Sequence, residues 1–354
     1  MDAAGSRRSG LARLSAHQLF WPLATLALLL IISVIANPGF LHIGWADGHF
    51  RGNLIDVLNR AAPLMLVSVG MTLVIATRGL DISVGAVVAI SAAVAALMIG
   101  GSMDATAAEQ VSRFPLGVAI VGALAVSMVC GLWNGLLVVK TGMQPIVATL
   151  ILMVAGRGVA QLITDGQILT VYYSPYFYIG NGFFAGLPFA LLLAAAVTLL
   201  VHIALTRTAL GLFVRSIGIN PLAARVAGVR SQLITVCLYV FCSLTAGVAG
   251  LIVSSNVKSA DGNNAGQLME LDAILAVTLG GTSLTGGRFS LAGTIVGALI
   301  IQTLTSMIYS IGVPPEVNMV VKAVLVFAVM LLQSAEFRGL MRRLVTRGEP
   351  GAAA

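Results

Sequence analysis

Long apolar runs alternate with short polar stretches along almost the whole chain. An α-helix needs roughly 20 residues to cross a bilayer. On this guide we predict ten membrane-spanning helices over residues 19–36, 61–77, 83–100, 115–138, 145–163, 187–205, 232–253, 272–282, 291–309 and 319–334. The eighth is the shortest. Membrane β-strands would be about 10 residues of alternating polarity, so these continuous runs predict an all-α polytopic membrane protein.

Lys and Arg residues orient these helices, because they gather in cytoplasmic loops. With the N-terminus inside, fourteen of them fall in inner segments and four in outer loops. Both termini are therefore predicted to be cytoplasmic, as tails of residues 1–18 and 335–354 around a membrane domain of residues 19–334. Basic residues before the first run would also suit a cleaved signal peptide, but the length of the run and the many runs that follow favour an uncleaved helix.

An odd number of crossings in each half would make two five-helix halves an inverted repeat, a common transporter design. The sequence similarity between the two halves is weak. "TRGLDISVGA" and "TSLTGGRFSLAGTI" each place a Gly-rich turn and a Ser before an apolar run. We hold the repeat as a hypothesis.

Composition supports a membrane protein and offers little chemistry. The 354 residues are 58% hydrophobic and 9% charged, against about 25% charged in soluble chains. The net charge of +7 comes from arginine clusters between runs, so it sets topology and does not indicate nucleic-acid binding. Cys130, Cys237 and Cys242 lie in apolar runs and are expected to be small buried hydrophobes. No catalytic or metal constellation is visible, and "VVKTG" lacks the first glycine of a Walker A motif. We expect no enzyme activity and no bound cofactor or metal.

The inner loop 206–231 contains a short helix with both ends marked. In "INPLAARVAGV", Asn220 suits the N-cap, Pro221 the first helical position and Gly228 the left-handed stop. Two interpretations are open. The helix could seat in a groove of a partner protein, or it could lie on the lipid surface. Its shortness and Ala content favour the protein partner.

The stretch "VIATRGLDISVGAVVAI" (residues 74–90) places two charges within an apolar region. We interpret it as an inner turn between two spans. Gly79 makes the tight turn, Asp81 or Ser83 caps the third span, Gly85 follows in its first turn, and Arg78 pairs with Asp81. The turn could simply close a hairpin or could also contact a moving gate.

Polar residues inside the spans are candidates for a solute path, namely Asn134, Arg157, Gln161 and Gln302. The alternative for each is a hydrogen bond between helices. No Asp or Glu is predicted deep in a span, which argues against an ion-coupled carrier. The outer loops 260–272 and 175–183 could dock an external protein or simply be solvated.

Several stretches together resemble the permease subunit of bacterial ABC sugar importers of the ribose, xylose and galactofuranose class. Their sequences are most similar to the galactofuranose branch. The resemblance covers residues 55–334. It rests on "GMTLVIATRGLDISVGA" (70–86), "GLWNGLLV" (131–138), "QPIVATLILMVAGRG" (144–158), "GINPLAARVAGV" (218–229) and "ELDAILAVTLGGTSLTGGRFSLAGTIVGALI" (270–300). Arg78 departs from the family, which often has Gly there.

The resemblance implies a multi-pass protein of the bacterial inner membrane that imports a monosaccharide by alternating access. Its partners would be a cytoplasmic ABC ATPase that uses the ATP, a second permease, identical or homologous, and a periplasmic sugar-binding protein. It also implies that the loop helix couples to the ATPase. We assign this coupling role to Gly211, Arg215, Gly218, Asn220, Pro221, Ala223, Ala224, Ala227 and Gly228. A permease for branched-chain amino acids and a self-sufficient secondary carrier are the alternatives.

Overall fold

Helices make up most of the chain in this computed structural model, which describes residues 19–46, 48–101, 113–310, 312 and 315–333. The two tails predicted to be cytoplasmic lie outside the described residues. Within these described ranges, six helices are long and apolar enough to cross a membrane, namely α3 (Asn53–Ala76), α5 (Leu116–Lys140), α6 (Pro145–Ile163), α8 (Phe189–Arg207), α11 (Ser231–Val257) and α13 (Leu291–Ser310).

Four further helices fall on the remaining predicted runs, namely α2 (Phe20–Ala36), α4 (Val84–Ile99), α12 (Met269–Leu279) and α14 (Pro315–Gln333). A helix therefore occupies each of the ten predicted ranges. The structure adds α7 (Ser174–Asn181) and α9 (Leu210–Ile219), which the pattern did not predict, beside the expected α10 (Pro221–Val226).

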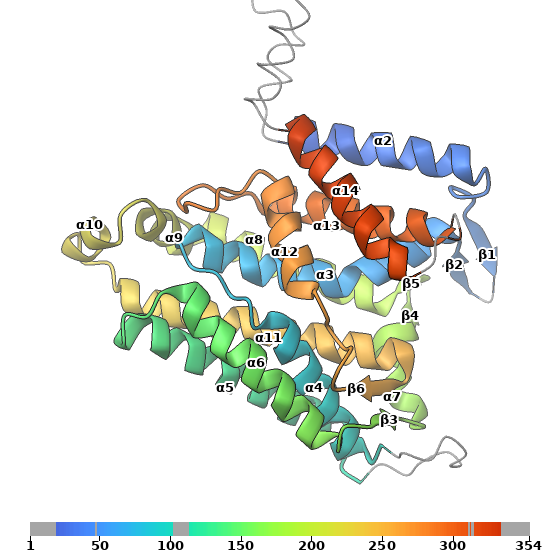
Figure 1. Cartoon of the computed structure of the whole chain (residues 1–354), viewed down its shortest axis with the longest axis horizontal. Coiled ribbons are helices and arrows are strands. Elements are labelled where there is room, and N and C mark those ends of the chain that lie inside the picture. The colour runs from blue at the N-terminus through green and yellow to red at the C-terminus, as the bar shows by residue number, and fades with distance from the viewer. Residues whose placement is uncertain (1–18, 47, 102–112, 311, 313–314, 334–354) are drawn as a thin grey trace, which may run out of the picture.

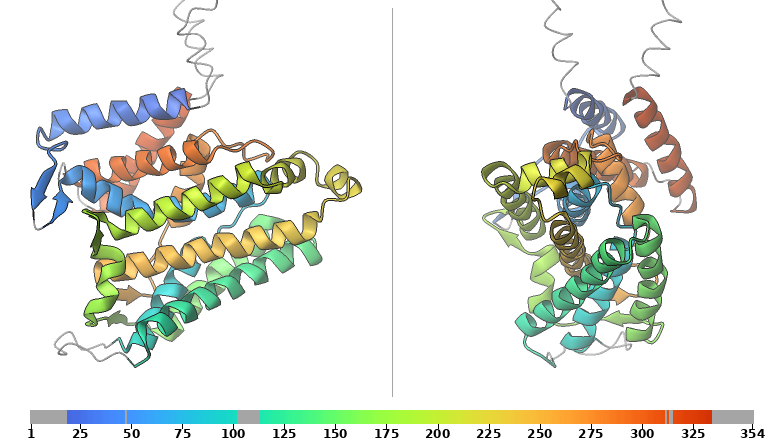
Figure 2. Two further views of the ribbon diagram at one scale, coloured as in Figure 1. Left: turned by 180° about the vertical axis from the view of Figure 1, so that it is seen from behind. Right: turned by 90° about the vertical axis from the view of Figure 1, so that its left-hand side faces the viewer.

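The long helices lie side by side and run between two ends of the molecule (Figures 1 and 2). One end carries α9 and α10, and we call it the α10 end. The other, the strand end, carries α7 and three antiparallel two-stranded sheets that an all-α prediction omits. These pair β1 (Gly44–Ala46) with β2 (His49–Arg51), β3 (Ile168–Thr170) with β6 (Ser259–Asp261), and β4 (Phe183–Phe184) with β5 (Leu187–Pro188). The β3–β6 pair joins loops that are distant in sequence, whereas the other two pairs are local hairpins.

The core forms where α11 packs against α3, α4 and α5. Small residues allow these helices to approach closely, as is usual between membrane helices. A Cβ added to Gly131 of α5 would lie only 2.6 Å from the carbonyl oxygen of Tyr239 in α11. Gly70 of α3 is equally crowded, since a Cβ there would lie 2.8 Å from the Cα atom of Cys242.

The helices α4 and α12 are short because each is preceded by a non-helical segment inside the bundle (residues 77–83 and 262–268). The two helices begin beside one another. A Cβ added to Gly85 in the first turn of α4 would lie 2.5 Å from the carbonyl oxygen of Gly266. Val88 also contacts Gly266, and it precedes the strand end of α4 by 11 residues, or roughly 17 Å at 1.5 Å per residue. The two non-helical segments therefore enter the bundle from opposite ends and stop near its middle.

Candidate functional site

The helix α10 has the ends that the sequence predicts. The side-chain Oδ1 of Asn220 accepts hydrogen bonds from the backbone N–H groups of Leu222 and Ala223, both at 3.0 Å. Pro221 occupies the first helical position. Gly228 adopts φ +86°, the left-handed conformation that favours glycine after a helix. The chain thus fixes the start and the end of this helix locally.

The surface of α10 is unusually apolar. Ala224 is buried against the rest of the chain, whereas Leu222 and Val226 are 70% and 84% exposed. Ile219, just before the helix, is 66% exposed. The helix projects from the end of the bundle (Figure 1, left), so these side chains are available to another protein or to lipid.

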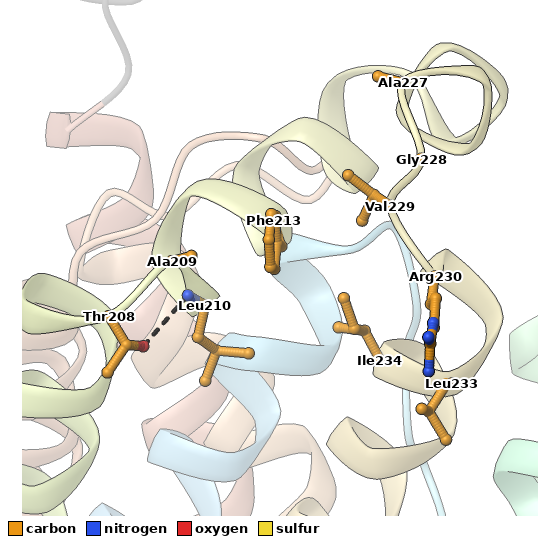
Figure 3. Close-up of a pocket in the computed structure, with 10 residues that line it drawn as sticks. All are labelled: Thr208, Ala209, Leu210, Phe213, Ala227, Gly228, Val229, Arg230, Leu233 and Ile234. Atoms are coloured by element: carbon orange, nitrogen blue, oxygen red, sulfur yellow. Dashed lines mark hydrogen bonds between the residues drawn. The ribbon is translucent and has the colours of Figure 1, made fainter.

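A cavity of about 650 Å³ lies between α9, the end of the α10 loop and α11. Phe213 from α9, Val229 from the loop and Ile234 from α11 point into it, and Ala227 and Gly228 form part of its rim (Figure 3). Helix α9 itself is held nearby by Arg215, whose guanidinium lies 5.3 Å from the ring centroid of Phe289.

Three backbone segments meet closely where α9 ends, at a point that we call the junction. It consists of Ala76, Arg78, Gly218, Ile219 and Gly287. Arg78 Nε donates a 2.6 Å hydrogen bond to the carbonyl oxygen of Gly218, and a terminal guanidinium nitrogen donates to that of Ile219. Gly287 N–H donates to the carbonyl oxygen of Ala76 at 2.9 Å. A side chain at Gly218 would overlap the backbones of Ala76 and Gly287.

Gly211 has a comparable role in the turn from α8 to α9. A Cβ at this position would overlap the carbonyl oxygen of Leu205, so only glycine lets the two helices turn this sharply. The structure thus gives packing reasons for Gly211 and Gly218 that do not depend on a partner.

Arg78 does not form the expected pair with Asp81, because its guanidinium reaches the junction instead. The residue adopts φ +65° directly after α3, and Gly79 N–H closes the turn with a 2.9 Å bond to the carbonyl oxygen of Val74. A left-handed residue at this point suits the glycine of the family pattern. Arg78 accepts that conformation and gains two hydrogen bonds.

Asp81 belongs to a buried polar network with Ser83 and Asn134, each 0% exposed. Asp81 Oδ1 accepts from Ser83 N–H at 3.0 Å, from Ser83 Oγ at 2.6 Å and from Asn134 Nδ2 at 3.3 Å. Asn134 Nδ2 also lies 2.8 Å from Ser83 Oγ. Asn134 is therefore a buried partner of the 77–83 segment.

The expectation that no acid lies deep in the bundle is wrong. Asn134 precedes the end of α5 by six residues, which places Asp81 roughly 9 Å inside the α10 end. Glu270, expected in an outer loop, stands in the first turn of α12 and is 3% exposed. Within the described chain, Asp81 Oδ2 and Glu270 Oε2 have no hydrogen-bond partner.

Two residues that the sequence did not single out hold the backbone of the 77–83 segment. Thr149 Oγ1 accepts from Ile82 N–H at 3.2 Å and lies 3.4 Å from the carbonyl oxygen of Leu80. The hydroxyl of Tyr239 donates to that same oxygen at 3.4 Å. Both contacts join segments that are distant in sequence, so no local sequence pattern marks either residue as part of this site.

Arg157 and Gln161, adjacent on α6, contact the second non-helical segment. Arg157 donates to the carbonyl oxygens of Asn263 at 3.2 Å and Ala265 at 2.5 Å, and Gln161 Nε2 lies 2.5 Å from Asn263 Oδ1. Gln302 is elsewhere. It lines a separate polar cavity of about 480 Å³, with residues of the loop after α2, of α3 and of α13 that include Asp56, Arg60 and Tyr309.

Asp261 opens the second segment at the strand end. Burial raises the pKa of its carboxyl group, but hydrogen bonds from the Asn264 side chain and from the backbone N–H groups of Asn263 and Asn264, with the nearby Arg157, outweigh this effect. The pKa is held below its ordinary value of 3.8. Asp261 is therefore a charged anchor for the turns that follow.

Other reactive groups are sparse in the described part of the chain. No three His, Cys, Asp or Glu side chains there could jointly hold a metal ion. All three cysteines are free thiols, but the expectation that all three are buried is wrong for Cys237. Cys130 and Cys242 are buried, but Cys237 is exposed on an apolar surface.

Comparison with known proteins identifies the family. Residues 53–330 match the family described as branched-chain amino acid transport system / permease component. The galactofuranose transporter permease of Escherichia coli K12 is 46% identical over 92% of this chain and 94% of its own length. The fructose import permease of Bifidobacterium longum is 36% identical (93% and 91%). The ribose import permease of E. coli K12 is 34% identical (87% and 92%).

No solved structure gives a significant match to this chain. The sequence matches nevertheless cover most of the chain and include every residue of the junction and of both non-helical segments. The chain therefore belongs to the family of membrane permease components of transport systems.

Proposed function

We propose that this chain is the membrane-spanning permease of an ATP-driven ABC importer that moves a monosaccharide into the cytoplasm. The names of its relatives support a sugar, because galactofuranose, fructose and ribose permeases all align over nearly the full chain. Its partners would be a cytoplasmic ABC ATPase, a second permease and a periplasmic sugar-binding protein, in the inner membrane of a bacterium.

The proposed topology has ten crossings with both termini and the α10 end in the cytoplasm. The distribution of Lys and Arg supports this orientation. Six helices of the described chain are long and apolar enough to cross alone, and α2 and α14 supply two further crossings. Helices α4 and α12 complete their crossings with the preceding non-helical segments, which is acceptable in a membrane where such backbone is enclosed by protein or faces water.

The inverted repeat gains support from these two crossings. Each is the third crossing of its five-helix half, and each consists of a non-helical entry followed by a helix, one from the α10 end and the other from the strand end. The partner of the 77–83 segment would thus be 262–268. The similarity between the sequence motifs instead suggested that the 77–83 segment corresponds to the loop before α13.

The junction carries the proposed mechanism. Exposed apolar residues on α10, Leu222 and Val226, would seat in the ATPase. A displacement of α10 when ATP closes the ATPase would pass through Ile219 and Gly218 to Arg78, because these groups are directly hydrogen-bonded. Arg78 is the second residue of the non-helical segment that leads to α4, so the movement would reach the middle of the bundle and open a path between the paired permeases.

Uptake of radiolabelled monosaccharide tests this proposal in cells that express the chain with its partner proteins. Val226→Glu places a charge in the proposed interface without disturbing the fold, since the side chain is almost fully exposed. We expect loss of uptake with normal membrane insertion, whereas Val226→Leu should retain transport. Normal uptake by the Glu variant would exclude the coupling role of α10.

The buried carboxylates Asp81 and Glu270 are the observation that favours the second candidate, an ion-coupled carrier. Depletion of ATP separates the two. An importer driven by ATP stops although the ion gradient persists, and a secondary carrier continues until an ionophore removes the gradient. Competition by branched-chain amino acids against sugar uptake tests the remaining alternative cargo.

A further inference from the structure

The non-helical segment 262–268 exposes three amide side chains beside the exposed Leu268. Its side chains Asn263, Asn264 and Gln267 are exposed. The segment starts beside the last turn of α6, where Gly262 packs on Ala160. It ends next to Gly85 near the middle of the bundle. The exposed amides therefore form a strip that leads from the strand end toward the centre.

Lipid is an unsuitable neighbour for this strip. Non-helical backbone at membrane depth is found where protein covers it or where it lines water. Neighbouring protein within the chain accounts for the inner side of the segment only. Arg157 donates to the carbonyl oxygens of Asn263 and Ala265. Asp261 accepts from the backbone N–H groups of Asn263 and Asn264 and from the side-chain amide of Asn264, and the side chains of Asn263 and Gln267 stay exposed.

The strip also has the chemistry of a site for neutral polyols. The bond between Gln161 Nε2 and Asn263 Oδ1 leaves the carbonyl oxygen of Gln161 and the amide nitrogen of Asn263 without a hydrogen-bond partner in the described chain. One is an acceptor and the other a donor, side by side, and each sugar hydroxyl can serve both. Exposed, amide-based contacts of this kind bind weakly, which suits passage more than storage.

We propose that the segment 262–268, with the edge of α6 that carries Arg157 and Gln161, lines the water-filled path of a polyhydroxylated solute in the outer half of the membrane. This inference rests on the proposed transport function. It extends the two α6 candidates to Asn263, Asn264 and Gln267, and it assigns Asn134 a structural role instead.

Cysteine accessibility in membrane vesicles containing the whole transporter tests the path. The background is Cys237→Ser, since Cys130 and Cys242 are buried. Asn263→Cys and Gln267→Cys are treated with a small cationic methanethiosulfonate. The control is Val159→Cys, which is 44% exposed on α6 but lies about 160° around the helix from Gln161. A thiol in apolar surroundings has a raised pKa and little reactive thiolate.

We expect both strip variants to react about tenfold faster than the control, or more, because each unit of pKa changes the thiolate fraction tenfold. Excess monosaccharide should slow the reaction at Asn263→Cys, and the modification should block uptake. Equal, slow reaction at all three positions would overturn the proposal. It would indicate that lipid or a second permease covers the strip and excludes water from it. Reaction at the strip without solute protection would also overturn it as a solute path.

The labelling rate does not depend on an ATPase, so it separates this inference from the proposed function. ATP-independent uptake with a reactive, solute-protected strip would reject the ABC mechanism and keep the path. ATP-driven uptake with an unreactive strip would keep the ABC mechanism and reject the path.

Discussion

The two hydrogen bonds of Arg78 and its left-handed backbone make opposite contributions, and substitution can separate them. Arg78→Ala removes both bonds and keeps a side chain at φ +65°. Arg78→Gly removes the bonds and also relieves the backbone strain. The two variants therefore differ mainly in the strain.

The magnitudes follow from the geometry. A hydrogen bond to a charged group contributes about 1.5–3 kcal/mol, and the partial exposure of Arg78 argues for the lower limit, so both bonds together stabilise by about 3 kcal/mol. A non-glycine residue in the left-handed region costs about 1 kcal/mol. We expect destabilisation by about 3 kcal/mol for Arg78→Ala and about 2 kcal/mol for Arg78→Gly.

Thermal denaturation of the purified chain in detergent measures the order of stability of these variants. At roughly 2 °C per kcal/mol for a large chain, the Ala variant should melt about 6 °C and the Gly variant about 4 °C below the wild type. Arg78→Lys, with a charge but no fork of donors, should lie between the Gly variant and the wild type. Equal melting of the Ala and Gly variants, or wild-type melting of either, would refute the role assigned to the junction.

Three further predictions follow from described contacts. Gly85→Ala should destabilise the fold by about 1–3 kcal/mol through overpacking against Gly266 and Glu270, whereas Gly117→Ala, also the second residue of its helix but with nothing within 4 Å, should be neutral in the same melting assay. Asn220→Ala should cost about 1 kcal/mol by removing the N-cap of α10, and Asn220→Ser should restore most of it. Because the pKa of Asp261 is lowered in the folded chain, its stabilisation is complete above the ordinary value of 3.8 and is lost as pH falls through the lower folded value. Hydrogen exchange at the Asn263 and Asn264 amides, corrected for intrinsic rates, should stay constant from neutral pH down to the ordinary value of 3.8 and rise as the pH falls from there through the lower folded value, and Asp261→Asn should abolish this dependence.

Features specified by neighbouring residues could be predicted from the sequence. The apolar runs located a helix in all ten predicted ranges, because hydrophobicity over about 20 residues depends on nothing distant. Asn220, Pro221 and Gly228 defined α10 because caps act over a few residues. The family resemblance was likewise carried by contiguous motifs.

Features that depend on distant segments were missed. A charge within an apolar region usually marks the end of a span, so Asp81 was interpreted as part of a surface turn. Its burial depends on Asn134, 53 positions away. Arg78 was assigned a local partner, but it reaches Gly218, 140 positions away. No periodicity in the sequence distinguishes these outcomes.

The hydrogen bonds of α6 give this helix a mechanical role. Thr149 holds the backbone of the segment that enters from the α10 end, and Arg157, eight residues or roughly 12 Å further along, holds the segment that enters from the strand end. Helix α6 thus holds both non-helical segments of the bundle. A shift of α6 along its axis would break both contacts together, which couples rearrangements at the two ends of the molecule.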